Sequence, residues 1–120
     1  QAVFSRATFG PGARTNGVLD HMEKEIAEVR KEIEKMENNN DFSAGFHDVA
    51  KEQVDLVILA FDGQIRSLWA MHPDLTVDHI VFMAWEMIRG KQAKNELRNW
   101  PDWRTADPNK AIEHVRGTHD

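Results

Sequence analysis

The stretches Glu25-Ile26-Ala27-Glu28 and Glu52-Gln53-Val54-Asp55 place two carboxylates three residues apart on each of two predicted helices. Residues three or four apart share a helix face, so each pair projects in one direction. Packed antiparallel, the two helices would bring all four carboxylates into one small volume. Four anions there repel one another unless cations lie between them, and carboxylate oxygens suit Mg²⁺ or Mn²⁺. The two stretches therefore predict a metal site between two helices.

The first of these helices is predicted from about Val18 to Met36. Its apolar residues recur in alternating steps of four and three, which gives a stripe that faces a core: Met22, Ile26, Val29, Ile33 and Met36. A second stripe lies beside the first and holds the candidate functional residues His21, Glu25 and Glu28, followed by Glu32. These polar residues therefore border the core face.

The second helix is predicted from near Ser43 to about Met71. Its middle, Val54 to Phe61, is apolar on every side except at Asp55, and a helix that is apolar all round is expected to be buried all round. Asp55 and Asp62 would then be enclosed by apolar neighbours, where a carboxylate needs a cation or an arginine. Arg66, four residues after Asp62, is the local partner for that second acid.

The remaining segments complete an all-α chain, read as one domain over residues 1–120. Residues 1–16 contain Gly10, Pro11 and Gly12 without a sustained period, which predicts an irregular N-terminal arm. His72-Pro73 breaks the second helix, and Thr76 is the expected N-cap of a third, which Gly90 ends or kinks. Asp107-Pro108 predicts a last short helix to about Arg116. No strand pattern is present, and the fold is expected to be a helical bundle.

Composition excludes several classes of function. The chain has no cysteine, which rules out zinc–thiolate sites and thiol redox chemistry and fits a cytoplasmic protein. Its formal net charge of −5 argues against binding to a nucleic-acid polymer or an anionic membrane. The longest apolar run, Leu56 to Phe61, is too short to span a bilayer.

Together the motifs resemble the MazG-like all-α nucleoside triphosphate pyrophosphatases, and more specifically their dATP/dGTP diphosphohydrolase subgroup, which includes phage MazZ-type dGTP diphosphohydrolases of the host cytoplasm. The paired acids carry the general resemblance. The specific one rests on five further segments, and it spans nearly the whole chain: Thr8-Phe9-Gly10-Pro11, His21-Met22-Glu23-Lys24-Glu25, Leu59-Ala60-Phe61-Asp62-Gly63, Lys91-x-x-Lys94-Asn95-x-x-Arg98-x-Trp100-Pro101 and Ala111-Ile112-Glu113-His114.

The resemblance implies hydrolysis of a nucleoside triphosphate between its α and β phosphates, with a divalent metal. It implies metal ligation and catalysis by Glu25, Glu28, Glu52 and Asp55. It implies phosphate and sugar contacts by Lys91, Lys94, Asn95 and Arg98. Two further substrate-binding candidates are His21, which could orient a ligand or a phosphate, and Trp100, as part of an aromatic wall. Many MazG-like proteins open the first motif with two adjacent acids, whereas here Lys24 precedes Glu25, so it stays open which acid beyond these four, if any, helps to orient the water. Glu28 or Glu52 could act as general base on a metal-bound water, and the sequence does not choose between them.

We therefore expect a Mg²⁺- or Mn²⁺-dependent enzyme that converts a purine deoxynucleoside triphosphate, dGTP or dATP, to its monophosphate in nucleotide-pool control. The base would lie against an aromatic wall supplied by Phe9, Trp85, Trp100 or Trp103. A homodimer or homotetramer is expected, with the apolar helix faces at the interface. Two alternatives stay open: a pyrimidine (dUTP- or dCTP-type) pyrophosphohydrolase, and a non-enzymatic helical interaction module.

Overall fold

The computed structural model describes residues 2–116. Its elements are α1 (Ala2–Phe9), α2 (Thr15–Asn39), α3 (Phe42–Met71), α4 (Val77–Leu97) and the 3-10 turn η1 (Trp103–Thr105). Within these residues the only β structure is an isolated antiparallel bridge between Asn99 and Val115. The all-α prediction is confirmed. The chain divides into two compact units, Gln1–Ala84 and Trp85–Asp120.

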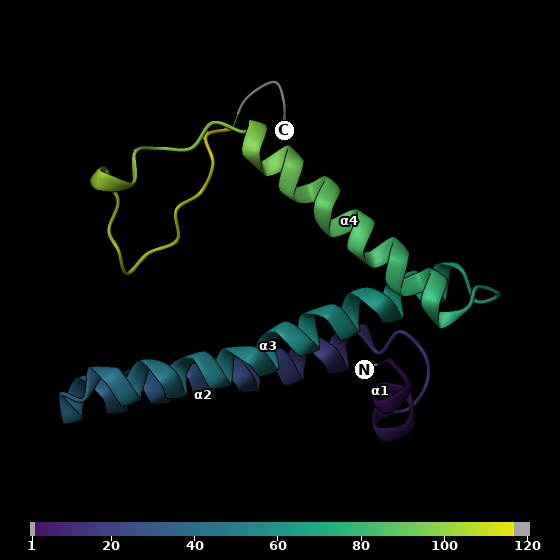
Figure 1. Ribbon diagram of the computed structural model, residues 1–120, viewed down its shortest axis with the longest axis horizontal. Coiled ribbons are helices and arrows are strands. Elements are labelled where there is room, and N and C mark those ends of the chain that lie inside the picture. Colours follow the sequence, from purple (N-terminus) through teal and green to yellow (C-terminus); the bar gives the residue numbers. More distant parts are fainter. Residues whose placement is uncertain (1, 117–120) are drawn as a thin grey trace. The chain divides into compact units, whose positions relative to one another are not determined.

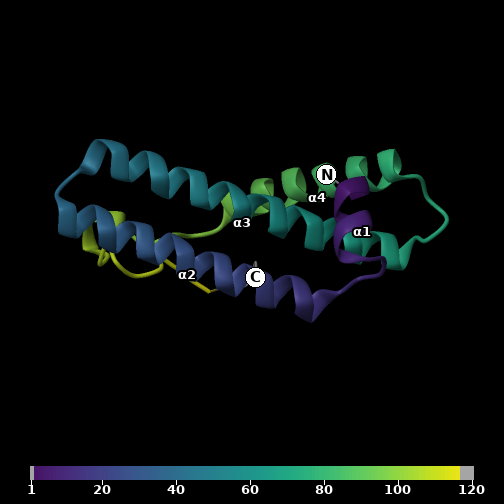
Figure 2. The same cartoon turned by 90° about the horizontal axis from the view of Figure 1, so that it is seen from below.

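The first unit is built on a long antiparallel hairpin of α2 and α3, which lie side by side in both views (Figures 1 and 2). The hairpin turns at Asn40, which adopts a left-handed conformation with φ 56°, as asparagine does more readily than most residues. Asp41 then caps α3 by accepting a hydrogen bond from the Ala44 backbone N–H at 3.4 Å. Both helices therefore lie close to their predicted positions and antiparallel, as expected.

Small residues set how closely the two helices approach. A Cβ atom on Gly63 would lie 3.1 Å from Cγ1 of Val18, and one on Gly45 would overlap the Met36 side chain. Val18, Val29 and Met36 are the buried residues of α2. The predicted apolar stripe of this helix is therefore only partly buried, because Ile26 and Ile33 remain 41% and 36% exposed.

The hydrophobic core of the first unit lies at one end of the hairpin. It joins α1, the C-terminal part of α3 and the start of α4 through Ala2, Ile65, Leu68, Ile80 and Ala84. Ile80 and Ala84 have no exposed surface at all. Full burial of a side chain such as isoleucine stabilises a fold by about 1.5–3 kcal/mol, so this cluster anchors α1, which is distant in sequence, to the end of α3 and the start of α4.

The prediction of an irregular N-terminal arm over residues 1–16 was wrong for Ala2–Phe9, which form α1. Ala2 and Ser5 lie three residues apart and are 7% and 1% exposed. A helix of this length has little stability of its own in water, so its contacts with α3 hold it. Sequence periodicity could not reveal it, because two small residues make a weak apolar signal. The irregular segment is confined to residues 10–14.

The apolar run Val54–Phe61 is not buried all round, which corrects a second prediction. Within the chain, α2 covers one face of α3, and Leu59 on that face is 9% exposed, whereas Val54 and Val57 are 53% and 68% exposed. Asp55 is likewise exposed. Asp62, by contrast, is buried as expected, at 4% exposure.

Two predictions about the rest of the chain also change. Thr76 does cap α4, accepting a hydrogen bond from the His79 N–H at 3.3 Å, but α4 passes through Gly90 and ends at Leu97. The predicted last helix, 107–116, is absent. Asp107 instead accepts a hydrogen bond from the Asn109 N–H at 2.9 Å, a side-chain turn that competes with helix formation.

Among the described residues, none of the helices combines the length and apolar character that crossing a bilayer requires.

Candidate active site

Three of the four predicted carboxylates meet between α2 and α3. Glu25 comes from α2, and Glu52 and Asp55 come from α3, one turn apart. One oxygen from each of the three lies within 4.8 Å of the others. Glu25 and Glu52 are half-buried and Asp55 is exposed, so the cluster opens to solvent. We call these three residues the acidic cluster.

The acidic cluster is electrostatically strained. Desolvation raises the pKa of Glu52 above its ordinary value, and the negative charges of neighbouring carboxylates raise it further, in decreasing order from Asp55, Glu25, Glu32 and Glu28. Like charges at short range disfavour ionisation, which is the physical cause of this shift. A cation among these oxygens would remove the repulsion, and hard oxygen ligands are the donors that Mg²⁺ and Mn²⁺ prefer.

The other two predicted site residues of α2 lie on either side of Glu25. His21 precedes it by one turn, with Nε2 3.6 Å from the Glu25 Oε1 atom. Glu28 follows it but is not part of the acidic cluster. Its side chain is 51% exposed and accepts a hydrogen bond from Lys31 Nζ at 3.3 Å. The predicted meeting of all four acids is therefore reduced to three.

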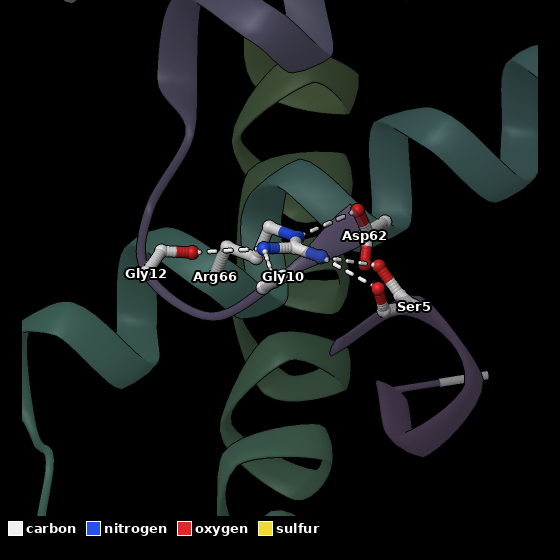
Figure 3. A network of polar contacts seen from close by, with 5 residues as sticks. All are labelled: Ser5, Gly10, Gly12, Asp62 and Arg66. Carbon is white, nitrogen blue, oxygen red and sulfur yellow. Dashed lines mark hydrogen bonds and ion pairs between the residues drawn. The ribbon is translucent and has the colours of Figure 1, made fainter. Parts of the chain in front are cut away.

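A buried arginine ties the N-terminal segment to α3 (Figure 3). Arg66 Nε donates to the Asp62 carboxylate at 2.9 Å, which confirms the predicted pair. Arg66 Nη1 donates to the backbone carbonyls of Gly10 at 2.7 Å and Gly12 at 3.0 Å. Nη2 donates to the Ser5 carbonyl at 3.0 Å and to the Ser5 hydroxyl at 2.7 Å. We call this set the Arg66 hub.

The sequence did not reveal the contacts that Arg66 makes beyond Asp62. Arg66 has five N–H donors in a planar fork, and a single carboxylate such as Asp62 does not use them all. The N–H groups that Asp62 leaves unused indicate that a buried Arg66 must have further hydrogen-bond acceptors. The sequence could not identify these acceptors, because three of them are backbone carbonyls that lie more than fifty residues away, in a segment predicted to be irregular.

The second compact unit carries the predicted cationic residues. Lys91 and Lys94 are exposed on α4. Asn95 accepts a hydrogen bond from Arg98 Nη1 at its side-chain oxygen (2.9 Å) and one from Trp100 Nε1 at its backbone carbonyl (2.8 Å). The Trp100 ring makes an edge contact with His114, with centroids 5.7 Å apart. Asn95 thereby fixes both Arg98 and Trp100 at the end of the helix.

The fold and its acidic cluster define an all-helical protein with a three-carboxylate centre between two antiparallel helices. Comparison with protein families makes the assignment specific: the model of the family described as dATP/dGTP pyrophosphohydrolase matches residues 1–118. The chain belongs to this family, and it is a nucleotide diphosphohydrolase. Searches of curated proteins and of solved structures give no match.

Proposed function

We propose that this enzyme converts a purine deoxynucleoside triphosphate, dGTP in preference to dATP, to the monophosphate and pyrophosphate, and that it depends on Mg²⁺ or Mn²⁺. The observation that carries the proposal is the convergence of Glu25, Glu52 and Asp55 oxygens within 4.8 Å. The family description supports the two purine substrates. The role would be control of the cytoplasmic nucleotide pool.

The donor set fits a divalent cation. The three carboxylates supply hard oxygen ligands, and the raised pKa of Glu52 reflects a concentration of negative charge that a cation relieves. When bound, the ion would supply charge neutralisation and water activation, the usual contributions of a metal to phosphoanhydride hydrolysis. Glu25, Glu52 and Asp55 would hold it. His21, beside Glu25, would fix the orientation of that carboxylate.

Glu28 completes the proposed ligand set. It lies three residues after Glu25 on the same face of α2, and exposed ion pairs such as Glu28–Lys31 contribute only about 0.2–1 kcal/mol. A bound cation therefore competes easily for this carboxylate. Either Glu28 or Glu52 would act as the general base that orients the attacking water.

Lys91, Lys94 and Arg98 would bind the β and γ phosphates. The triphosphate carries several negative charges. Lys91 and Lys94 lie on α4 and Arg98 directly follows its last residue, in a chain whose formal net charge is −5. Arg98 offers a two-point contact to a phosphate, which lysine does not. Asn95 and Trp100 would act through the hydrogen bonds that hold Arg98 and the indole in place.

We also propose that two copies of the chain pair through α3, as a homodimer or as half of a homotetramer. Val54, Val57 and Ile58 are 53%, 68% and 40% exposed on successive turns of this helix. A contiguous apolar surface of this kind is unusual on a monomer, and a second copy with the same face is its simplest complement.

The test is product analysis with each common nucleoside and deoxynucleoside triphosphate and dUTP, in Mg²⁺, Mn²⁺ or EDTA. We expect dGMP, then dAMP, together with pyrophosphate, and no product in EDTA. Glu52→Gln should lower kcat/KM at least about a hundredfold, because a metal supplies several kcal/mol of charge stabilisation. Glu34→Gln, an exposed change on α2 outside the acidic cluster, is the matched control and should retain activity.

Other outcomes have defined meanings. Preferential release of dUMP or dCMP would replace the purine assignment by the pyrimidine alternative. Intact nucleotides after incubation with folded, metal-loaded protein would contradict the proposal and favour the interaction module.

A further inference from the structure

A string of aromatic rings leads from the N-terminal segment to the acidic cluster. Phe4 and Phe9 meet edge to face with centroids 6.5 Å apart, and Phe9 meets His21 in the same way at 5.8 Å. His21 Nε2 is in turn 3.6 Å from Glu25 Oε1. Phe9 is thus separated from a carboxylate of the acidic cluster by a single imidazole ring.

The Phe9 ring is open to solvent although it lies beside a polar site. It is 38% exposed, and the Arg14 guanidinium carbon lies over the ring, 5.8 Å from its centroid. A packed phenylalanine would be covered, whereas a ring that binds a ligand keeps a face or an edge available. In a nucleotide, the ribose places the base a short distance from the α phosphate. A phosphate held at the acidic cluster would bring its base within reach of Phe9.

The Arg66 hub holds this ring in place. Its hydrogen bonds to Ser5 and to Gly10 bracket Phe9 in the chain, and its bond to Gly12 fixes the loop that follows. Gly10 and Gly12 have φ values of 89° and 93°, a region that side-chain-bearing residues rarely adopt, so the loop is built around these carbonyl contacts. The fork, Asp62 and Ser5 are all buried, which makes the attachment rigid.

We propose that Phe9 is a substrate-binding residue that contacts the purine base, and that Arg66 is the positioning residue that places it. Arg66 is 3% exposed and acts through its hydrogen bonds to the segment that carries Phe9. The inference rests on the proposed function and extends it by assigning the base subsite to the N-terminal segment of the chain.

Steady-state kinetics with dGTP separates the base contact from the phosphate contacts. Phe9→Ala should raise KM for dGTP at least about fivefold with a smaller effect on kcat, because stacking of a base on an aromatic ring is worth about 1–3 kcal/mol. Inhibition by inorganic tripolyphosphate, which has no base, should be unchanged. Phe9→Tyr keeps the ring and should retain KM. Phe42→Ala removes a similarly exposed ring, 47% exposed, from the opposite end of the hairpin and is the matched control.

A double-mutant cycle tests the role of Arg66. Arg66→Lys keeps a charge beside Asp62 but loses the planar fork, and it should raise KM for dGTP with little effect on tripolyphosphate inhibition. Added to Phe9→Ala, it should cause no further rise in KM, because both changes remove the same contact. Gly12→Ala, which strains the loop without altering Arg66, is the second route to the same result if Arg66→Lys folds poorly.

Limited proteolysis measures how firmly Arg66 holds the N-terminal segment on α3, independently of enzymatic activity. Trypsin cleavage after Arg6 should be faster in Arg66→Lys and in Gly12→Ala than in the unaltered protein, and unchanged in Phe9→Ala, because Arg6 lies over the Trp69 ring and not over Phe9.

The outcomes distinguish this inference from the proposed function. An unaltered protein that hydrolyses no purine nucleotide overturns both. Normal dGTP hydrolysis with an unchanged KM in Phe9→Ala overturns the base contact alone. Additive effects of Phe9→Ala and Arg66→Lys, or a fall in tripolyphosphate inhibition in Arg66→Lys, overturn the positioning role and leave Arg66 as a structural residue.

Discussion

At the scale of single residues, the negative charge of Glu52 suits the proposed metal binding but lowers the stability of the metal-free protein. Its pKa is raised in the folded protein by desolvation and by Asp55, Glu25, Glu32 and Glu28. A carboxyl whose folded pKa lies above its unfolded value contributes stability at low pH, and this contribution is lost as the pH rises through the folded pKa. At neutral pH the ionised Glu52 side chain therefore weakens the metal-free fold.

The corresponding prediction concerns Glu52→Gln in EDTA. At pH 7 the variant should have a higher Tm than the unaltered protein, because it removes a repelled charge, and the difference should shrink as the pH falls below the ordinary glutamate range. Mn²⁺ should raise the Tm of the unaltered protein more than that of the variant, because a ligand that binds the native state stabilises it. Differential scanning fluorimetry over a pH series measures all three. A lower Tm for Glu52→Gln in EDTA would contradict the electrostatic explanation.

At the scale of elements, the α2–α3 hairpin depends on glycine where the helices touch. A Cβ on Gly45 would overlap the Cβ and Cγ atoms of Met36, which cannot move as freely as the end of that side chain. Gly90, in contrast, lies on the exposed surface of α4 with no atom within 4 Å of an added Cβ. Both glycines lie within helices, but only Gly45 is required by a close contact, whereas the surroundings of Gly90 leave room for a side chain.

Alanine at these two positions should therefore act in opposite directions. Gly45→Ala should destabilise the protein by about 1–3 kcal/mol through overpacking. Gly90→Ala should stabilise it by about 0.5–1 kcal/mol through helix propensity. Urea unfolding followed by far-UV circular dichroism gives both values. If both substitutions stabilised the protein, Gly45 would have no role in the hairpin contact.

The elements also show what sequence could and could not predict. Both helices of the hairpin and the Thr76 cap were predicted, because local periodicity and capping determine them. Three of the four acids met as expected, since helical spacing fixes their face. The helix α1 and the contacts of Arg66 with Ser5, Gly10 and Gly12 were not predicted, because they depend on contacts between distant segments. The prediction of a last helix was wrong because the hydrogen bond from the Asn109 N–H to the Asp107 side chain forms a turn in place of a helix.

At the scale of the whole molecule, the exposed apolar face of α3 predicts an oligomer. Val57→Glu should shift the protein toward monomer in sedimentation velocity, because an unpaired charge at an apolar interface is costly. Lys35→Gln changes the net charge by the same amount on the exposed surface of α2 and should leave the oligomer intact. A monomer at all concentrations in the unaltered protein would remove the basis for the homodimer.

The Arg66 hub has a further consequence for how the chain is made. Its hydrogen bonds to Ser5, Gly10 and Gly12 join Arg66 to residues 54 to 61 positions earlier in the chain, and these partners leave the ribosome before Arg66 does. Ser5, Gly10 and Gly12 must therefore wait until most of α3 has been synthesised before their final contacts exist. This N-terminal segment is therefore translated well before it is fixed, and its docking requires that α3 has been synthesised at least as far as Arg66.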